Sequence, residues 1–237
     1  NTIGKTTPVV ANMKPFGQYL MNDIYNLGGS TIIMKHLIDK NVLNGDCITV
    51  TGNTLEKNLE NINTDILDLA NNQNLFNYNK PLKHDSHIRI FKGNISPEGS
   101  VGKITGKEGT KFNGKALVFE SEEEFINLIE QNNNKFNINK ILIDKVIVIR
   151  NQGPKGSPGM PEMLKATSLI NGMGLSDKVA FITDGRFSGG SHGFLIGHIT
   201  PEAYNNGVIS IIKNGDKIEI DAINNTINLN INKNKIN

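Results

Sequence analysis

The sequence predicts a mixed α/β fold, and three observations lead to this prediction. Apolar residues recur at helical spacing in the first third of the chain. From residue 84 onwards, short apolar runs separated by glycine turns dominate instead. Between these parts, residues 63–86 lose this periodicity and are rich in asparagine and lysine, as in a connector. We therefore expect one domain boundary, dividing the chain into residues 1–83 and 84–237.

Two helices are expected near the start of the chain. The first ends at Gly28 and Gly29, and Ser30 then caps the second. Their apolar positions are Phe16, Tyr19, Leu20, Ile24, Leu27, Ile33, Met34, Leu37 and Ile38. Residues 47–51 alternate like a short strand, and Thr54 begins a third helix. The first part is thus predicted to be mainly helical.

The second part is predicted to contain six short strands and two helices. The strands are expected at residues 88–91, 100–104, 116–119, 146–150, 179–183 and 208–212. Ser121 and Glu124 form a capping-box pattern before one helix, and Pro161 is expected to begin the other. The pair Asn214 and Gly215 predicts a hairpin turn between residues 209–213 and 217–221.

Composition excludes several classes of partner. A net charge of +2 over 237 residues, without a basic run interleaved with aromatic residues, argues against nucleic acid. The chain has no apolar run long enough to span a bilayer and no signal-peptide pattern, so we expect a soluble protein. Cys47 is the only cysteine, which excludes an intrachain disulfide. A small-molecule partner is therefore favoured.

The stretch that organises the chain is residues 179–203, VAFITDGRFSGGSHGFLIGHITPEA. A buried strand is expected to run into a glycine-rich turn that carries the polar residues Asp184, Arg186, Ser188, Ser191 and His192, and then into a helix. Backbone N–H groups at such a helix start can stabilise an anion. The equally open alternative is an ordinary turn in which Ser191 is the N-cap.

A second polar stretch covers residues 151–164, NQGPKGSPGMPEML. Its glycines and prolines predict a rigid, tightly bent loop, and Glu162 is expected in the first turn of the helix that follows. On position alone, Glu162 is interpreted as an acidic residue that stabilises a helix start. Lys155 can hold an anion near the loop or can simply face solvent.

Three other motif readings fail. The GGSHG run of residues 189–193 fits a nucleophile elbow, but no later Asp or Glu followed by His completes a triad. Residues 109–116 nearly match a P-loop, yet Ala116 replaces the required Ser or Thr. The five histidines do not cluster as zinc ligands do.

Five blocks in order, at residues 14–29, 45–59, 93–106, 151–164 and 179–203, resemble the dihydroxy-acid dehydratase family, which also contains the sugar-acid and phosphogluconate dehydratases. The resemblance implies a C-terminal swivelling β/β/α barrel domain preceded by the helical tail of an N-terminal α/β domain. It also implies removal of water from a 2,3-dihydroxy acid, such as 2,3-dihydroxy-3-methylbutanoate of branched-chain amino-acid biosynthesis, to give the 2-oxo acid. The enzyme is then expected as a homodimer in the cytoplasm, or in a plastid or mitochondrial matrix.

The resemblance assigns roles to four residues. Ser188 matches the family's base for the C2 proton, while Arg186 and Ser191 are expected to bind the substrate, Arg186 also contributing positive charge. Glu162 matches an oxygen ligand of Mg²⁺, and an iron–sulfur cluster is expected to accept the C3 hydroxide.

The chain also departs from the family's pattern. Cys47 does not match a cluster motif and is interpreted as a small buried apolar residue. The cluster ligands and the other Mg²⁺ ligands are therefore expected in a missing N-terminal portion, which makes this chain the C-terminal part of the enzyme. A sugar-acid or phosphogluconate dehydratase, or an inactive binding or assembly module, remain alternatives.

Overall fold

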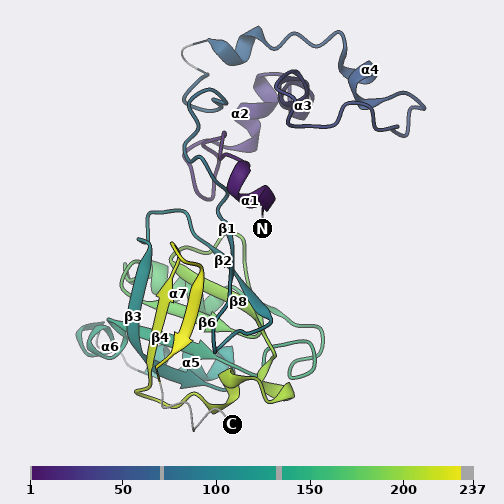
Figure 1. The fold of residues 1–237 in the computed structure, drawn as a ribbon. Helices are drawn as coiled ribbons and strands as arrows, with labels where there is room; N and C mark the ends of the chain where they lie inside the picture. Colours follow the sequence, from purple (N-terminus) through teal and green to yellow (C-terminus); the bar gives the residue numbers. More distant parts are fainter. Residues whose placement is uncertain (1, 70–71, 132–134, 231–237) are drawn as a thin grey trace. The chain divides into compact units, whose positions relative to one another are not determined.

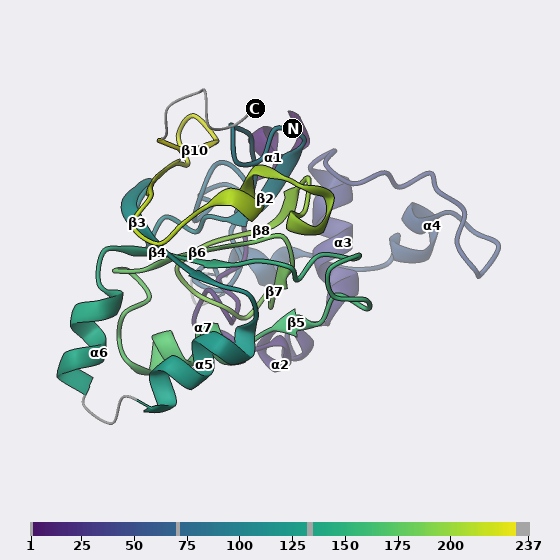
Figure 2. The ribbon, with the colours of Figure 1, turned by 90° about the horizontal axis from the view of Figure 1, so that it is seen from below.

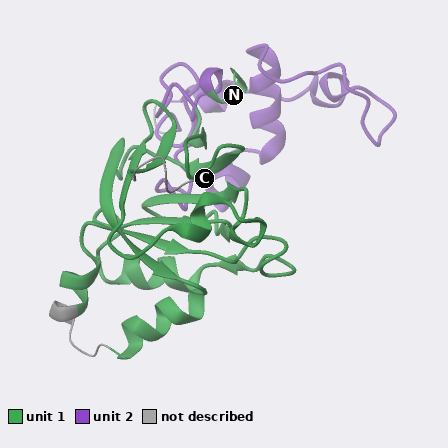
Figure 3. Cartoon of the chain, turned by 60° about the horizontal axis from the view of Figure 1, so that its bottom comes forward, with its two compact units in different colours: residues 1–4, 86–237 green, residues 5–85 purple. Residues whose placement is uncertain are grey.

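The computed structural model describes residues 2–69, 72–131 and 135–230 (Figure 1). It divides the chain into two compact units (Figure 3). We call Lys5–Asp85 the helical unit, and Asn1–Gly4 with Ser86–Asn237 the barrel unit. In the described part of the chain, no helix has the length and apolar character needed to cross a bilayer.

The helical unit packs short helices around a small apolar core. Its elements are α2 (Met21–Asn26), α3 (Ser30–Asp39), α4 (Leu55–Leu59) and the 3₁₀ turn η1 (Asp65–Asp68), and α1 (Thr2–Thr6) lies at the junction of the two units in the sequence. The buried core side chains are Ile24, Ile32, Leu67, Leu75 and Phe76. Thr54 caps α4 as predicted, because its hydroxyl accepts a hydrogen bond from Lys57 N at 3.2 Å.

Ser30 is the first residue of α3 and Gly29 is its N-cap residue, so the predicted Ser30 cap is wrong. Two predictions for residues 47–51 are wrong as well. The strand expected at residues 47–51 is absent from the described structure, where only an isolated bridge joins Ile48 to Thr54. Cys47, interpreted as a small buried residue, is exposed. Both errors have one cause, since the apolar alternation at residues 47–51 lies in a turn whose Ile48 and Val50 also face solvent.

The barrel unit is built on an eight-stranded mixed sheet in the order β1-β2-β8-β6-β4-β3-β9-β10. Neighbours among β3, β4, β6 and β8 are parallel, and the strands at both ends of the order are antiparallel. The strands are β1 (Ile88–Phe91), β2 (Gly99–Lys103), β3 (Lys111–Phe119), β4 (Lys145–Ile149), β6 (Ala180–Thr183), β8 (Phe194–Thr200), β9 (Lys217–Asp221) and β10 (Thr226–Leu229).

Hydrogen bonds between the two ends of this order nearly close the sheet into a barrel. Lys92, directly after β1, donates from N to Asn225 O at 3.0 Å and accepts from Ile227 N at 3.0 Å. Asn94 Nδ2 donates to Leu229 O at 2.7 Å. The edge strands therefore find partners instead of remaining open.

Alternating residues of the central strands enter two separate cores. Val146, Val148, Ala180 and Ile182 point into the barrel, where they meet side chains from β1, β3, β8, β9 and β10. Ile147, Ile149, Phe181 and Leu195 point outward. There they pack against the helices α5 (Glu122–Gln131), α6 (Lys135–Leu142) and α7 (Lys165–Gly172), which Figure 2 shows beside the sheet. Burial on both faces explains the nearly continuous apolar runs of β4 and β6.

The mixed α/β prediction is confirmed, and five of the six predicted strands form. The sixth, at residues 208–212, is wrong because this segment is the 3₁₀ turn η3 (Val208–Ile211). The hairpin at Asn214 and Gly215 is wrong too. Asn214 Oδ1 accepts from Val118 N at 2.6 Å and Gly215 N donates to Ala116 O at 2.9 Å, so the turn attaches to β3.

Candidate functional site

The two polar loops singled out from the sequence follow neighbouring parallel strands. One loop leaves the carboxyl end of β4 and the other leaves that of β6. A small parallel sheet then joins them, since β5 (Glu162–Met163) pairs with β7 (Arg186–Phe187). Glu162 and Arg186 are register partners in this sheet. The candidate site therefore lies at the carboxyl ends of neighbouring parallel strands, a position where ligands commonly bind in α/β folds.

A buried carboxylate fixes the start of both loops. Asp184 is only 1% exposed, and it accepts hydrogen bonds from Asn151 N at 3.1 Å, Gln152 N at 2.9 Å and Ala203 N at 2.8 Å. These bonds tie the residues after β4 to the residues after β6 and β8. Asp184 was grouped with the polar turn residues in the sequence, but its structural position makes it an anchor of the loops.

A second buried carboxylate, Glu202, was missed by sequence reasoning. It accepts from Lys155 N at 3.2 and 3.1 Å and from Gly156 N at 3.1 Å. Gly153 lies so close to Glu202 that an added Cβ would collide with the carboxylate. The Gly-rich loop is thus wrapped around an acidic side chain that lies more than 40 residues away, and no local pattern announces this contact.

Glu162 lies on β5 with its side chain exposed. Helix α7 begins only at Lys165, with Leu164 as its N-cap residue. The prediction that Pro161 begins the helix is therefore wrong, and so is the interpretation of Glu162 as a residue of its first turn. The β5–β7 pairing explains the difference, because it holds Glu162 in extended backbone.

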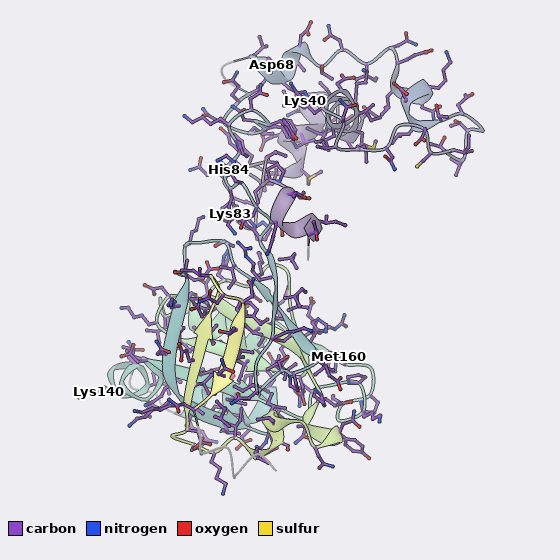
Figure 4. The ribbon with its side chains drawn as sticks, viewed as in Figure 1. Lys40, Asp68, Lys83, His84, Lys140 and Met160 are labelled. Atoms are coloured by element: carbon purple, nitrogen blue, oxygen red, sulfur yellow. The ribbon has the colours of Figure 1, made fainter. Side chains whose placement is uncertain are left out.

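Arg186 is exposed and its guanidinium is turned to the neighbouring loop. Arg186 Nε donates to Met160 O at 2.7 Å, and Met160, labelled in Figure 4, adopts a left-handed φ of 45°. This bond is a second link between the two loops, in addition to the pairing of β5 with β7. Arg186 nevertheless remains exposed.

Ser188 begins a tight turn that lines a cavity of about 170 Å³. Its hydroxyl accepts from Gly190 N at 3.3 Å, and its carbonyl accepts from Ser191 N at 3.1 Å. The next element is the strand β8 and not the predicted helix. The predicted stabilisation of an anion at Ser188 by a helix dipole is therefore wrong.

Ser191 is buried and faces helix α7. Its Oγ lies 2.8 Å from Thr167 Oγ1, and Thr167 Oγ1 donates to Leu164 O at 3.1 Å. Because the single hydroxyl proton of Thr167 is used in that bond, Ser191 is the donor of the pair. The alternative that Ser191 is an N-cap is wrong, since β8 follows it.

Lys103 on β2 approaches the Ser188 turn from another part of the sheet. Its Nζ donates to Gly189 O at 2.6 Å, and the side chain lines the cavity that Ser188 also lines. Burial lowers the pKa of the Lys103 ammonium, and the Glu108 carboxylate offsets part of this change. Sequence reasoning missed Lys103, because a single lysine in a short strand carries no signal.

The residues that the structure describes include no group of three or more His, Cys, Asp or Glu side chains arranged to hold a metal ion. Glu162, the expected Mg²⁺ ligand, is an exposed carboxylate in the barrel unit, and Cys47, which was not expected to be a cluster ligand, is an exposed thiol in the helical unit. Thus Glu162 can supply one oxygen to a shared Mg²⁺ site. Cys47 alone does not fit an iron–sulfur cluster, which needs several ligands.

Comparison with known proteins identifies relatives for both parts of the chain. Residues 74–237 match the C-terminal family of dihydroxy-acid/6-phosphogluconate dehydratases, and residues 1–58 match the N-terminal family. A dihydroxy-acid dehydratase of Francisella tularensis subsp. novicida is 53% identical over 99% of this chain and 40% of its own length. One from Cytophaga hutchinsonii is 48% identical over 99% of this chain and 40% of its own length.

Both family descriptions are those of dehydratases, which are lyases. The chain belongs to the dihydroxy-acid/6-phosphogluconate dehydratase family. It spans about 40% of the length of these curated relatives.

Proposed function

We propose that this chain forms the C-terminal part of a dihydroxy-acid dehydratase. The complete enzyme removes water from 2,3-dihydroxy-3-methylbutanoate to give the 2-oxo acid in branched-chain amino-acid biosynthesis. The observation that carries the proposal is the Ser188 turn, in which a partly buried hydroxyl lines a cavity beside a lysine in a chain about 50% identical to dihydroxy-acid dehydratases. A family member with a phosphogluconate or sugar-acid substrate is the second candidate, because the family description names 6-phosphogluconate, a phosphorylated sugar acid, beside dihydroxy acids.

In the proposed reaction, Ser188 removes the proton from C2 of the substrate. A serine hydroxyl is too weak a base for this step, so Ser188 acts as an alkoxide that the surrounding positive charge and N–H groups stabilise. Arg186 and Ser191 contact the substrate, and the terminal nitrogens of Arg186 suit its carboxylate. The cavity beside Ser188 contains the apolar side chains of Val101, Phe187 and Leu195 as well, which suit a branched alkyl group.

Glu162 contributes one carboxylate to a Mg²⁺ site whose other ligands lie in the portion of the enzyme outside this chain. When bound, Mg²⁺ would supply positive charge that stabilises the negative charge developing on the substrate. The iron–sulfur cluster of the proposed enzyme takes its ligands from that same portion, because Cys47 does not fit the role. This chain's residues therefore serve the C2 proton step.

The isolated chain is expected not to dehydrate 2,3-dihydroxy-3-methylbutanoate. Its described residues contain one exposed thiol and no grouped metal ligands, so departure of the C3 hydroxyl lacks assistance. The measurement is 2-oxo acid formation by the purified chain, with iron and sulfide analysis of the same sample. Turnover above the uncatalysed rate, or a stoichiometric cluster in the chain, would refute the division of the active site proposed here.

Glu162→Gln in the complete enzyme is expected to weaken Mg²⁺ binding while the iron content stays constant. Glutamine keeps the size of the side chain and removes the charge that a hard cation prefers. The measurement is the Mg²⁺ concentration that gives half-maximal activity. Glu219→Gln is the matched control, because Glu219 is an exposed carboxylate on β9. An unchanged Mg²⁺ requirement in Glu162→Gln would exclude Glu162 as a ligand.

A substrate panel separates the two candidate functions. If the first proposal is right, the complete enzyme has a higher kcat/KM for 2,3-dihydroxy-3-methylbutanoate than for 6-phosphogluconate or a sugar acid. The apolar part of the cavity is the physical reason, since a polyol chain would leave its hydroxyls facing Val101 and Leu195. The opposite preference would move the assignment to the second candidate.

A further inference from the structure

One peptide group contacts both Lys103 and Ser188. The carbonyl of the Gly189–Gly190 peptide accepts a hydrogen bond from Lys103 Nζ at 2.6 Å. The N–H of the same peptide donates to Ser188 Oγ at 3.3 Å. The three groups therefore form a chain that runs from a cation, through one peptide unit, to the proposed catalytic oxygen.

We propose that Lys103 is a positioning residue that makes Ser188 a base by polarising the Gly189–Gly190 peptide. This inference rests on the proposed function, since it explains how the Ser188 alkoxide is stabilised. Donation from an ammonium to the carbonyl withdraws electron density from the peptide nitrogen. The Gly190 N–H becomes a stronger donor, and the bond to Ser188 Oγ strengthens as negative charge develops there.

Lys103 suits this role better than Arg186, which the sequence had favoured for the positive charge. Arg186 is exposed, and its Nε is already held by Met160 O on the neighbouring loop. Lys103 is partly buried, so its charge is screened less by solvent. Its contact with the turn is to a neutral carbonyl, which leaves its charge available to an anion nearby. The lowered pKa of Lys103 reflects the cost of this burial.

The surrounding fold holds the chain of hydrogen bonds in place. On one side, Phe187 packs edge-to-face on Phe181 at 5.9 Å between ring centroids. On the other side, Ser191 is fastened to Thr167 in α7. Lys103 itself ends β2, whose Gly102 is in register with Ile196 of β8. The lysine and the serine turn are thus attached to neighbouring strands of one sheet.

Three replacements of Lys103 separate its charge from its hydrogen bond. Lys103→Met removes both, Lys103→Gln keeps a donor without charge, and Lys103→Arg keeps charge and donors. Lys115→Met is the matched control, because Lys115 is an exposed lysine on β3. In the complete enzyme, we expect Lys103→Met to lower kcat on the order of 10- to 100-fold with a small change in KM, below the loss seen for a direct oxyanion donor. Lys103→Arg recovers most of the rate and Lys103→Gln does not.

A second readout does not depend on activity. In the isolated chain, the amide proton resonance of Gly190 is expected to move upfield in Lys103→Met and to stay close to the wild-type position in Lys103→Arg. The Lys115→Met control leaves that resonance unchanged. This measurement tests the hydrogen-bond chain even where a variant loses its cofactors in the complete enzyme.

The outcomes distinguish this inference from the function on which it rests. If the complete wild-type enzyme shows neither dehydration nor C2 proton exchange, the proposed function fails, whatever the Gly190 resonance shows. If the wild type is active and Lys103→Met keeps its kcat within about 2-fold, the role of Lys103 is overturned and the function stands. Rescue by Lys103→Gln equal to that by Lys103→Arg would also overturn it, because charge would then be unnecessary.

Discussion

Ser188→Ala is expected to eliminate both dehydration and C2 proton exchange in the complete enzyme, with a loss in kcat on the order of 10² to 10⁴. The change deletes one oxygen from a partly buried position on a turn that other contacts hold, so the fold and the cofactor content should remain. The measurement is turnover and solvent exchange with substrate deuterated at C2. Retention of C2 exchange in Ser188→Ala would show that another group removes the proton.

Ser191→Ala is the internal control for this experiment. Ser191 donates its hydroxyl proton to Thr167, so its loss removes a buried hydrogen bond and costs about 1 kcal/mol of unfolding free energy. We expect a change in stability or KM and a nearly normal C2 exchange rate. If Ser191→Ala abolished exchange while Ser188→Ala remained active, the base would have been assigned to the wrong serine.

Asp184→Asn is expected to lower the free energy of unfolding of the barrel unit by about 2–4 kcal/mol. The carboxylate accepts three backbone N–H groups, and an amide can offer only one oxygen to them. With that oxygen facing Asn151 and Ala203, the NH₂ group meets Gln152 N–H, so two donors oppose each other in a buried position. Thermal unfolding of the isolated chain should show a midpoint lower by roughly 5 to 15 °C.

Asp177→Asn is the matched control, because Asp177 is an exposed carboxylate in the segment between α7 and β6. Its unfolding free energy should stay within about 0.5 kcal/mol of the wild type. If Asp184→Asn behaved like this control, the three hydrogen bonds would not anchor the loops, and the positions of Ser188 and Glu162 would need another explanation.

Local sequence patterns predicted the structure correctly where it depends on residues within a single element. The apolar runs at β4 and β6 predict strands because burial on both faces leaves no polar positions. Thr54 predicts a helix start because its hydroxyl satisfies a free N–H of the first turn. Ser188, Arg186 and Ser191 stand out as polar residues on a glycine-rich turn after a buried strand, whereas only the family resemblance singled out Glu162 as a ligand. Their proposed roles remain predictions that the experiments above test.

Local sequence patterns gave wrong predictions where the structure of a segment depends on hydrogen bonds to residues distant in the sequence. The residues of β8 have spacing compatible with a helix, but they lie between β6 and β2 and complete a sheet. Asn214 and Gly215 have the composition of a hairpin turn, but β3 supplies their hydrogen-bond partners. In each case, pairing with a strand far away in the sequence outweighed the local preference.

The sequence by itself determined the mixed α/β class, the family resemblance and the two polar loops, because periodicity and motifs depend on residues that are neighbours in the chain. Only the tertiary structure decided that Glu162 pairs with Arg186, that Asp184 and Glu202 hold the loops, and that Lys103 reaches the peptide beside Ser188. These contacts join residues that lie 19 to 86 positions apart in the sequence. Sheet order and register bring such residues together, and a local pattern carries no information about either.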